Sequence, residues 1–271
     1  MPFSVLLSIY TKENPKYFND CLKSLLEQSY LPNEIVIVKD GVITNELNEV
    51  LEKFVLIYQN VKVVPLLTNH GLGFALNEGL KHCQYELVAR MDTDDLAKPN
   101  RFERQVKFME NNPEIAVVGA WVEEFQDTPK NIISVRSLPE TSQKLVLYAK
   151  KRNPLNHPVV MFRKSEVMKA GGYQHFPLFE DYYLWARMIM NGAKLYNIQE
   201  CLLSFRSSPE MYKRRGGFKY AIAEVKFLRV LKSIGFITNS ECIINIATRF
   251  LIRIMPNQLR RYIYQILLRK H

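Results

Sequence analysis

Short apolar runs alternate with helical segments over the first 122 residues, and this alternation is the feature that most constrains the fold. In the helical segments apolar side chains recur at helical spacing, and Pro15 and Pro99 stand at two expected first positions. Such alternation with short connections is typical of a doubly wound, mostly parallel α/β sheet. The predicted strands are 3–10, 34–38, 61–67, 87–91 and 115–122, and the predicted helices are 15–29, 46–56, 72–82 and 99–111.

The second half of the chain is less regular. Residues 123–152 form a predicted connector with local structure, and the composition changes after Arg206. The basic cluster 213–217 marks the predicted end of the catalytic part. In between we expect a strand at 159–162, a short helix at 165–170 and a stronger helix at 180–190.

Polar side chains follow three of the predicted strands at their carboxyl ends. They are Tyr10-Thr11, Asp40 and the run Asp92–Asp95. Ligands of doubly wound sheets bind beyond the carboxyl ends of the strands. We therefore expect these groups to meet at one edge of the sheet and form a ligand site.

Three carboxylates, Asp92, Asp94 and Asp95, stand within four positions. Carboxylates this close repel one another unless they are solvated or share a cation. The pattern suits a Mg²⁺ or Mn²⁺ ion that keeps open positions for a diphosphate and neutralises charge on a leaving nucleoside diphosphate. Alone, the motif also fits an acidic turn that caps the next helix. Asp40, beside Gly41, suits either a hydrogen bond to a base such as uracil or an ordinary turn.

The other candidate groups have plain structural alternatives. Glu180 and Asp181 open a helix, where acids complement the helix dipole, but such an acid is also the usual base for an attacking hydroxyl. His157 precedes a proline, a position where a lone His is more often a satisfied turn residue than a catalyst. Arg214 and Arg215 suit a pyrophosphate contact or a solvated basic run.

The net charge of +10 is unevenly placed. Residues 216–271 hold ten Lys/Arg and two Asp/Glu, a net of +8, so the preceding part is nearly neutral. This asymmetry predicts an anionic partner surface, either nucleic acid or acidic lipid.

Two amphipathic stripes lie within this basic segment. The first is Ile243, Ile246, Ala247, Phe250, Leu251 and Ile254, and the second is Leu259, Tyr262, Ile263, Ile266 and Leu267, opposite Arg260, Arg261 and Arg269.

The second stripe predicts a helix that lies in a membrane interface, with packing against the catalytic part as the alternative.

No uncharged stretch is long enough to span a bilayer, so we do not expect an integral membrane protein. No basic region precedes the first apolar run, so we do not expect a signal peptide. Four widely spaced cysteines predict reduced thiols of a cytosolic protein. The run 71–76 has Leu76 where a dinucleotide fingerprint needs a small residue, so we expect no nicotinamide cofactor.

An ordered set of motifs resembles family 2 glycosyltransferases, above all bacterial enzymes that assemble O-antigen or exopolysaccharide repeat units. The set is NHGLGFALNEGL at 69–80, ARMDTDD at 89–95, PNRF at 99–102 with Gln105, and EDYYLW at 180–185. The resemblance covers residues 2 to 215. It implies a GT-A fold, a Rossmann-like nucleotide-diphospho-sugar transferase sheet flanked by helices, together with a UDP-sugar donor, Mn²⁺ or Mg²⁺, and inversion at the anomeric carbon.

The resemblance also implies roles for individual residues. Asp94 and Asp95 would hold the metal, Asp92 and Asp94 the ribose and diphosphate, and Asp181 would be the base with Glu180 beside it. Many relatives carry Arg at the position of Leu76, so a phosphate contact is missing or comes from another residue, for which Arg90 is the candidate. By the same resemblance the nucleoside pocket would be lined by Tyr10, Thr11, Glu13 and Asp40. From their chemistry alone, His157, Arg214 and Arg215 are candidates to contact the acceptor or the pyrophosphate.

The sequence thus predicts an inverting, metal-dependent transferase that moves a hexose, galactose as the best guess, from a UDP-sugar to a lipid-diphosphate-linked saccharide in bacterial surface-polysaccharide biosynthesis. A sugar-nucleotide pyrophosphorylase and a non-enzymatic nucleic-acid-binding protein are the alternatives. A pyrophosphorylase should have a phosphate loop after the first strand, and residues 10–15 of this chain do not form one. A nucleic-acid-binding protein would leave the carboxylates unexplained. We expect a catalytic domain at 1–215, with 1–98 for the nucleotide sugar and 99–215 for the acceptor, and a basic helical tail at 216–271. The expected location is cytoplasmic, peripheral on the inner membrane, with no nucleic-acid partner.

Overall fold

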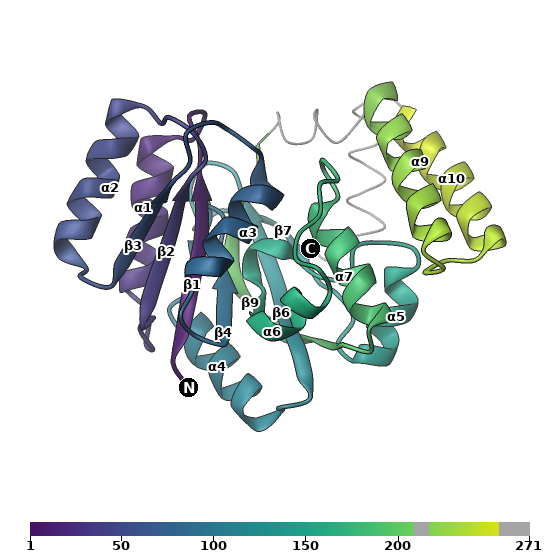
Figure 1. Ribbon diagram of the computed structural model, residues 1–271, viewed down its shortest axis with the longest axis horizontal. Coiled ribbons are helices and arrows are strands. Elements are labelled where there is room, and N and C mark those ends of the chain that lie inside the picture. The colour runs from purple at the N-terminus through teal and green to yellow at the C-terminus, as the bar shows by residue number, and fades with distance from the viewer. Residues whose placement is uncertain (209–216, 255–271) are drawn as a thin grey trace.

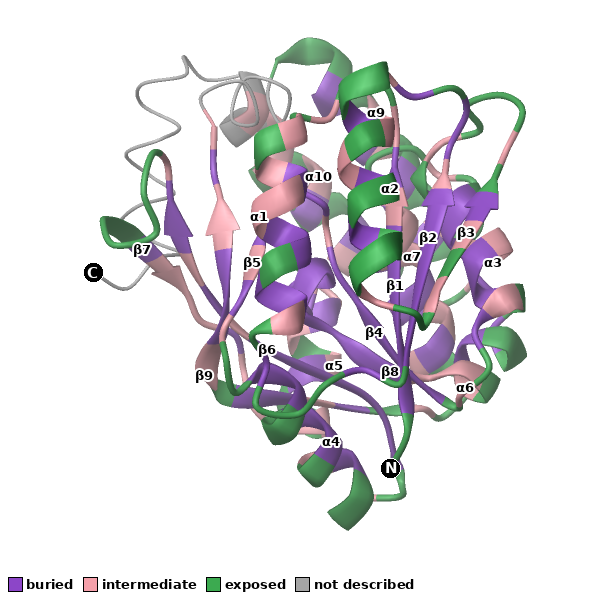
Figure 2. Ribbon diagram, turned by 90° about the vertical axis from the view of Figure 1, so that its left-hand side faces the viewer, coloured by how far each residue is buried: buried purple, intermediate pink, exposed green. Residues whose placement is uncertain are grey.

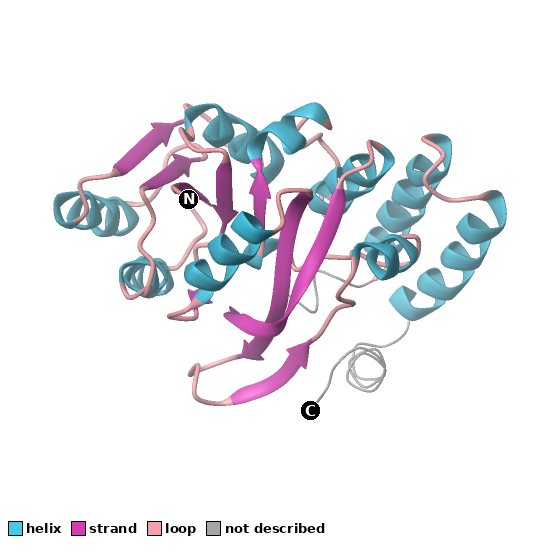
Figure 3. Ribbon diagram, turned by 90° about the horizontal axis from the view of Figure 1, so that it is seen from below, coloured by secondary structure: helices cyan, strands magenta, loops and turns pink. Residues whose placement is uncertain are grey.

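The computed structural model describes residues 1–208 and 217–254. A nine-stranded sheet has the order β3-β2-β1-β4-β8-β6-β9-β5, with β7 paired to β6, and helices cover both of its faces (Figure 1, Figure 3). The strands are β1 (Phe3–Ile9), β2 (Glu34–Lys39), β3 (Val61–Pro65), β4 (Leu87–Arg90), β5 (Leu96–Ala97), β6 (Ile115–Phe125), β7 (Ile132–Arg136), β8 (Met161–Arg163) and β9 (Lys194–Arg206). The helices are α1 (Pro15–Leu26), α2 (Asn45–Ile57), α3 (Leu72–His82), α4 (Arg101–Asn111), α5 (Ser142–Ala149), the 3-10 helix η1 (His157–Val159), α6 (Lys164–Lys169), α7 (Glu180–Met190), α9 (Phe218–Ser233) and α10 (Asn239–Ile254).

The first half of the sheet is parallel, as predicted. β1 pairs with β2 and β4, and β2 pairs with β3, all in parallel. The second half is mixed: β6 and β9 are parallel, whereas β8 runs antiparallel to β4 and β6, β7 to β6, and β5 to β9. The α/β class is confirmed, but a mostly parallel sheet describes only the first half. Antiparallel neighbours can be joined by a short hairpin, as β6 and β7 are, whereas β5 and β8 pair with strands that lie far away in the chain.

Helix starts follow local capping chemistry. Asn14 caps α1 by accepting from the backbone N–H groups of Lys16 and Tyr17, with Pro15 at the first helical position. The predicted start of α4 at Pro99 is wrong by two residues. The backbone N–H of Lys98 still donates to the carbonyl of Leu202 in β9, and Pro99 and Asn100 then form a turn in which the N–H of Arg101 donates to the carbonyl of Lys98 at 2.9 Å.

Sequence periodicity does not predict β5, β7, α5 or β9. β7 and α5 lie inside the expected connector, and β9 interrupts its apolar residues with polar ones such as Asn197. Asn197 is nevertheless fully buried, because its side-chain amide donates to the carbonyls of Pro139 and Pro154. The predicted strand at 159–162 is in fact the end of η1 followed by β8.

Two apolar cores lie on opposite faces of the sheet, and Figure 2 shows the buried strands between helices whose outer sides are exposed. One core joins the strands to α1, α2 and α4, and the other joins them to α3, α6 and α7. A third cluster lies between α5 and α7 on one side and α9 and α10 on the other. The pair α9–α10 therefore packs beside α7 (Figure 1).

The first tail stripe coincides only in part with the buried face of α10. Ile246 packs against the third cluster, but Ile243 is 68% exposed. Cys242 and Asn245 face inward instead, because Asn245 donates to the carbonyl of Lys150 at the end of α5. The second stripe, from Leu259 to Leu267, lies outside the described residues, and so do Arg214 and Arg215. The predicted domain division stays a prediction.

None of the helices in the described ranges combines the length and the hydrophobicity that a bilayer span requires.

Candidate active site

The three carboxylates of the sequence motif come together just after β4. One carboxylate oxygen each from Asp92, Asp94 and Asp95 lies within 4.8 Å of the other two. Asp95 is fully buried; its Oδ1 accepts from the backbone N–H of Arg206 at 2.8 Å, and its Oδ2 has no hydrogen-bond partner among the described residues. Burial, followed by the charge of Asp92, raises the pKa of Asp94 to about 6, and burial with both neighbouring carboxylates raises the pKa of Asp95 well above its usual range.

A divalent cation fits this group. An unpartnered, buried carboxylate oxygen beside two further carboxylates is costly without a positive charge. Oxygen ligands of this kind are those that Mg²⁺ and Mn²⁺ prefer. The donor set therefore suits a hard cation that keeps positions open for a diphosphate.

Distant elements hold the carboxylate turn in place. Cys21 of α1 donates its thiol to the carbonyl of Asp92 at 3.3 Å. At the end of β9, Arg206 donates its Nε to the carbonyl of Asp94 at 3.0 Å, and its guanidinium lies 3.8 Å from the ring centroid of Tyr17. Sequence reasoning missed Arg206, because it ends a strand that the sequence pattern does not reveal.

Arg90, the predicted phosphate contact, is buried on β4 and pairs with the carboxylate of Asp92. Its Nε and Nη1 have no partner among the described residues. Arg101 is also fully buried and donates to the carbonyl of Arg90 at 2.6 Å and to Gln105 at 3.1 Å. Burial, and secondly the charge of Arg90, lowers the pKa of Arg101 to about 9. Arg101 of the PNRF motif, together with Gln105, therefore holds the end of β4 in place through buried hydrogen bonds.

His157 lies deep beside Arg90. Its Nε2 is 2.9 Å from the hydroxyl of Tyr173, and its ring meets Trp185 edge-on at 6.0 Å between centroids. Burial, and secondly Arg90, lowers the pKa of His157 well below its usual value, so the imidazole is neutral. These contacts match the structural alternative for His157, and its acceptor or pyrophosphate role stays a prediction.

The two acids of the EDYYLW motif open α7 as predicted. Asp181 is hydrogen-bonded by the side-chain amide of Asn153 at 2.6 Å, and burial raises its pKa. Burial also raises the pKa of Glu180 to about 7. Glu180 packs against Gly73 of α3, where an added Cβ would lie 3.3 Å from its Cγ. The charge of Arg90 lowers the pKa of both acids, as it does that of Asp94, so one arginine acts electrostatically on the carboxylate turn and on the start of α7.

Asp40 is a buried anchor for the loop after β3. Its carboxylate accepts from the backbone N–H of His70 at 2.7 Å and of Gly71 at 2.9 Å, and from the Asn69 amide at 3.0 Å. A carboxylate has roughly four lone-pair sites, so these bonds use most of them. The predicted contacts of Asp40, Tyr10, Thr11 and Glu13 with a nucleoside stay predictions.

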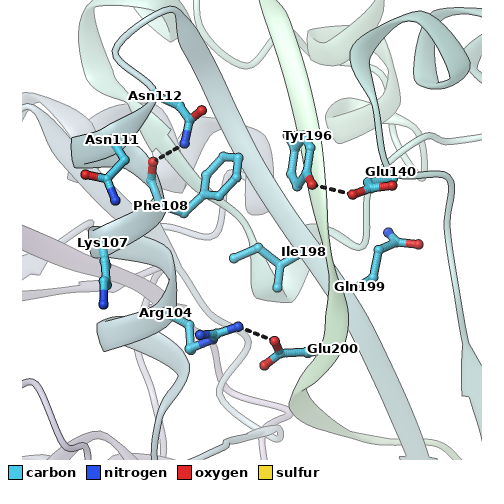
Figure 4. A pocket seen from close by; sticks show the side chains of 10 residues that line it. All are labelled: Arg104, Lys107, Phe108, Asn111, Asn112, Glu140, Tyr196, Ile198, Gln199 and Glu200. Carbon is cyan, nitrogen blue, oxygen red and sulfur yellow. Dashed lines mark hydrogen bonds and ion pairs between the residues drawn. The ribbon is translucent and has the colours of Figure 1, made fainter.

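A pocket of about 320 Å³ lies elsewhere, between α4 and β9 (Figure 4). Phe108 and Tyr196 stack there at 4.5 Å, Arg104 pairs with Glu200, and the Tyr196 hydroxyl donates to Glu140. Because these polar groups already pair with one another, the pocket offers few free groups to a ligand, and none of the predicted site residues lines it.

Comparison with known proteins gives a consistent set of relatives. A family model described as glycosyl transferase family 2 matches residues 4–168. The chain is 41% identical over 268 residues to the UDP-Gal:alpha-D-GlcNAc-diphosphoundecaprenol beta-1,3-galactosyltransferase of Escherichia coli, covering 99% of this chain and 97% of the relative. It is 39% identical over 266 residues to the amylovoran biosynthesis glycosyltransferase AmsE of Erwinia amylovora, covering 97% and 98% of the two chains.

Two solved structures share the fold. The mannosyltransferase PcManGT of Pyrobaculum calidifontis, in complex with GDP-Man and Mn²⁺, has a TM-score of 0.67 at 15% identity, covering 95% of this chain and 71% of that one. TarS 1–349 of S. aureus, in complex with UDP-GlcNAc, has a TM-score of 0.66 at 18% identity, covering 93% and 72%. At these identities the likeness concerns the fold alone.

Proposed function

The chain belongs to glycosyl transferase family 2 and has a GT-A fold, and from that premise we propose that it transfers galactose from UDP-galactose, with inversion, to a lipid-diphosphate-linked sugar. The donor and acceptor classes rest on the relative that is 41% identical over almost the whole of both chains. Family membership decides for a transferase and against the pyrophosphorylase and the non-enzymatic alternative.

The observation that carries the proposal is the buried oxygen of Asp95 without a partner, in a cluster with Asp92 and Asp94. These three residues would hold Mg²⁺ or Mn²⁺. The ion, when bound, supplies positive charge that stabilises the leaving diphosphate. Arg90, which pairs with Asp92, adds a second positive charge beside the carboxylates that would hold the diphosphate. Arg90 would thereby replace the arginine that many relatives have where this chain has the buried Leu76.

Asp181 is the proposed base for the acceptor. The acceptor hydroxyl oxygen forms a bond with the anomeric carbon, the bond from that carbon to the UDP oxygen breaks, and its electron pair leaves with UDP. The hydroxyl proton passes to the Asp181 carboxylate. Burial raises the pKa of Asp181, which brings a carboxylate closer to the range in which a general base works near neutral pH. The transition state has oxocarbenium character, as in other glycosyl chemistry.

We further propose that the protein binds peripherally to the cytoplasmic face of an anionic inner membrane, where a lipid-linked acceptor would be found. The net charge of +8 in residues 216–271 supports this proposal. Apolar side chains on loops next to the site support it as well. Val42, two residues after Asp40, is 82% exposed, and Leu67, just before the 69–71 loop that is hydrogen-bonded to Asp40, is 94% exposed. Leu178, two residues before Glu180, is 55% exposed.

A donor and acceptor panel tests the activity. The protein is incubated with UDP-galactose, UDP-glucose or UDP-GlcNAc and a GlcNAc-diphosphate lipid, and the products are identified by mass spectrometry and by the stereochemistry of the new bond. We expect one hexose to be added from UDP-galactose, with inversion. Efficient transfer from another donor only, or retention of configuration, would contradict the proposal.

A further inference from the structure

The chain segment between α5 and η1 brings Asn153 to Asp181. The Asn153 Nδ2 group donates to Oδ2 of Asp181 at 2.6 Å, although the residues are 28 positions apart. The other end of the same amide, Oδ1, accepts from the backbone N–H of Leu155 at 3.3 Å. Because that backbone group can only donate, the amide NH₂ must face Asp181. The orientation of the amide is thus fixed by its surroundings.

The segment that carries Asn153 is held from the C-terminal helices. Asn245 of α10, which is buried, donates to the carbonyl of Lys150 at 2.8 Å, and the Lys150 ammonium pairs with Glu241 of α10 at 2.9 Å. From α7, the hydroxyl of Tyr182 donates to the carbonyl of Ala149. Helices α7 and α10 therefore hold Ala149 and Lys150, at the end of α5 and three to four residues before Asn153.

A buried ion cluster fixes α10 to α9. The carboxylate of Glu224 accepts from Arg249 at 2.8 Å and from Arg253 at 2.7 Å, and the Arg253 guanidinium lies 4.5 Å from the ring centroid of Tyr220. Phe227 of α9 in turn stacks on Phe179, next to Glu180, at 4.6 Å between centroids. Removing one partner from a buried ion pair is costly, so the Glu224 cluster holds α10 on α9, and the Phe227–Phe179 stack joins α9 to the start of α7.

We propose that Asn153 is a positioning residue for Asp181, and that α10 keeps Asn153 in place. The inference rests on the proposed function, in which Asp181 removes the acceptor proton. It makes the α9–α10 pair, which lies beyond the region matched by the family model, a structural part of the active site.

Several charged and titratable groups interact electrostatically with Asp181. Glu180 belongs to the same helix, and Arg90 comes from β4 and Arg136 from β7. Burial raises the pKa of Tyr173, and the charge of Asp181 raises it further. Burial raises the pKa of Asp181, and the Asn153 hydrogen bond is the largest influence that lowers it. Without this bond the pKa of Asp181 rises further, and a smaller fraction of the base is ionised at neutral pH.

The test compares pH profiles of kcat in the full chain, with UDP-galactose and a GlcNAc-diphosphate lipid. Asn153→Ala should move the acidic limb to higher pH by about one unit, the usual worth of a hydrogen bond to a charged group, while KM for UDP-galactose changes less than about twofold. Asn153→Asp, which places a second carboxylate there, should move it further. Asn191→Ala is the matched control, because the Asn191 amide bonds the carbonyl of Lys169 at the exposed end of α7.

Asn245→Ala tests the part played by α10. Its acidic limb should move in the same direction as in Asn153→Ala, by a smaller amount, at temperatures where circular dichroism shows the variant folded. Glu241→Gln, which weakens the link to Lys150 at a partly exposed position, gives a second reading.

The possible outcomes distinguish a failure of this inference from a failure of the proposed function. A wild-type acidic limb in Asn153→Ala, with Asp181→Asn inactive, overturns the positioning role alone. Wild-type limbs in both α10 variants overturn the role of α10. Normal transfer by Asp181→Asn overturns the base assignment and this inference together.

Discussion

The backbone N–H of Arg206 donates to Oδ1 of Asp95 at 2.8 Å, although 111 positions separate the two residues in the sequence. This bond uses one carboxylate oxygen of a fully buried side chain and leaves the other without a partner. The end of β9 therefore orients the carboxylate that we expect to bind the metal.

Transfer activity should require a divalent cation, because Asp92, Asp94 and Asp95 need a positive charge to bind a diphosphate. Excess EDTA should abolish transfer, and added Mn²⁺ or Mg²⁺ should restore it. UDP binding measured by calorimetry should depend on the metal and weaken in Asp95→Ala. Full activity in excess EDTA would contradict the predicted metal requirement.

Metal-free protein should respond to Asp95→Asn in a pH-dependent way. The folded-state pKa of Asp95 is raised above its unfolded value by burial and by Asp94 and Asp92. An acid of this kind is most compatible with the fold when protonated, so its contribution to stability is lost as the pH rises above the unfolded value, near 4. In EDTA, Asp95→Asn should therefore stabilise the protein more at pH 8 than at pH 5. Urea unfolding at the two pH values measures the difference, and an equal effect at both would contradict the shift.

Asp181→Asn should lower kcat by about two to four orders of magnitude, the usual worth of a general base, and should leave folding and UDP binding intact. Asn is nearly isosteric with Asp, so a purely structural role predicts little loss. Transfer and calorimetry on the same preparation give both readouts. If turnover stays normal, Glu180, whose pKa is raised to about 7, is the next candidate for the base.

Arg90→Gln should lower kcat/KM for UDP-galactose about 10- to 100-fold, the range for a lost charge-assisted hydrogen bond. Arg104→Gln is the matched control, because Arg104 pairs with Glu200 in the separate pocket and should leave the kinetics unchanged. A loss confined to thermal stability, with normal kinetics, would assign Arg90 to the fold and leave the missing phosphate contact to another residue.

Membrane binding should depend on the residues beyond α10. The full chain should co-sediment with anionic vesicles at low salt, and a chain ending at Ile254 should bind them markedly less. The truncation is placed there because α10 belongs to the third apolar cluster and has to be kept for folding. Neutral vesicles are the control, and equal binding of both chains would show that this last segment is no anchor.

Much of the site could be predicted because its signals are local. The spacing of Asp92, Asp94 and Asp95 and the apolar strand before them lie within nine residues, and the structure brings these carboxylates together. The start of α1 is equally local, since Asn14 bonds backbone groups two and three residues ahead. In both cases neighbouring positions in the chain carry the physical cause.

Other features required the folded chain. No property of Asn153 marks it as a partner of Asp181, and the buried side of α10 depends on Lys150 and Glu224, which lie far away in sequence. The polar residues of β9 conceal the strand pattern, and the side-chain nitrogen of its buried Asn197 finds its acceptors on two prolines that are distant in the sequence.

The sequence by itself therefore determined the α/β class, the family and the acids of the two motifs, because periodicity, capping and motif spacing act over a few residues. Only the tertiary structure decided that the second half of the sheet is mixed, that Arg206 and Asn153 orient the carboxylates, and that α10 packs against the end of α5. Those relationships join residues that are distant in the chain, and a hydrogen bond or a burial of that kind exists only after folding has brought its partners together.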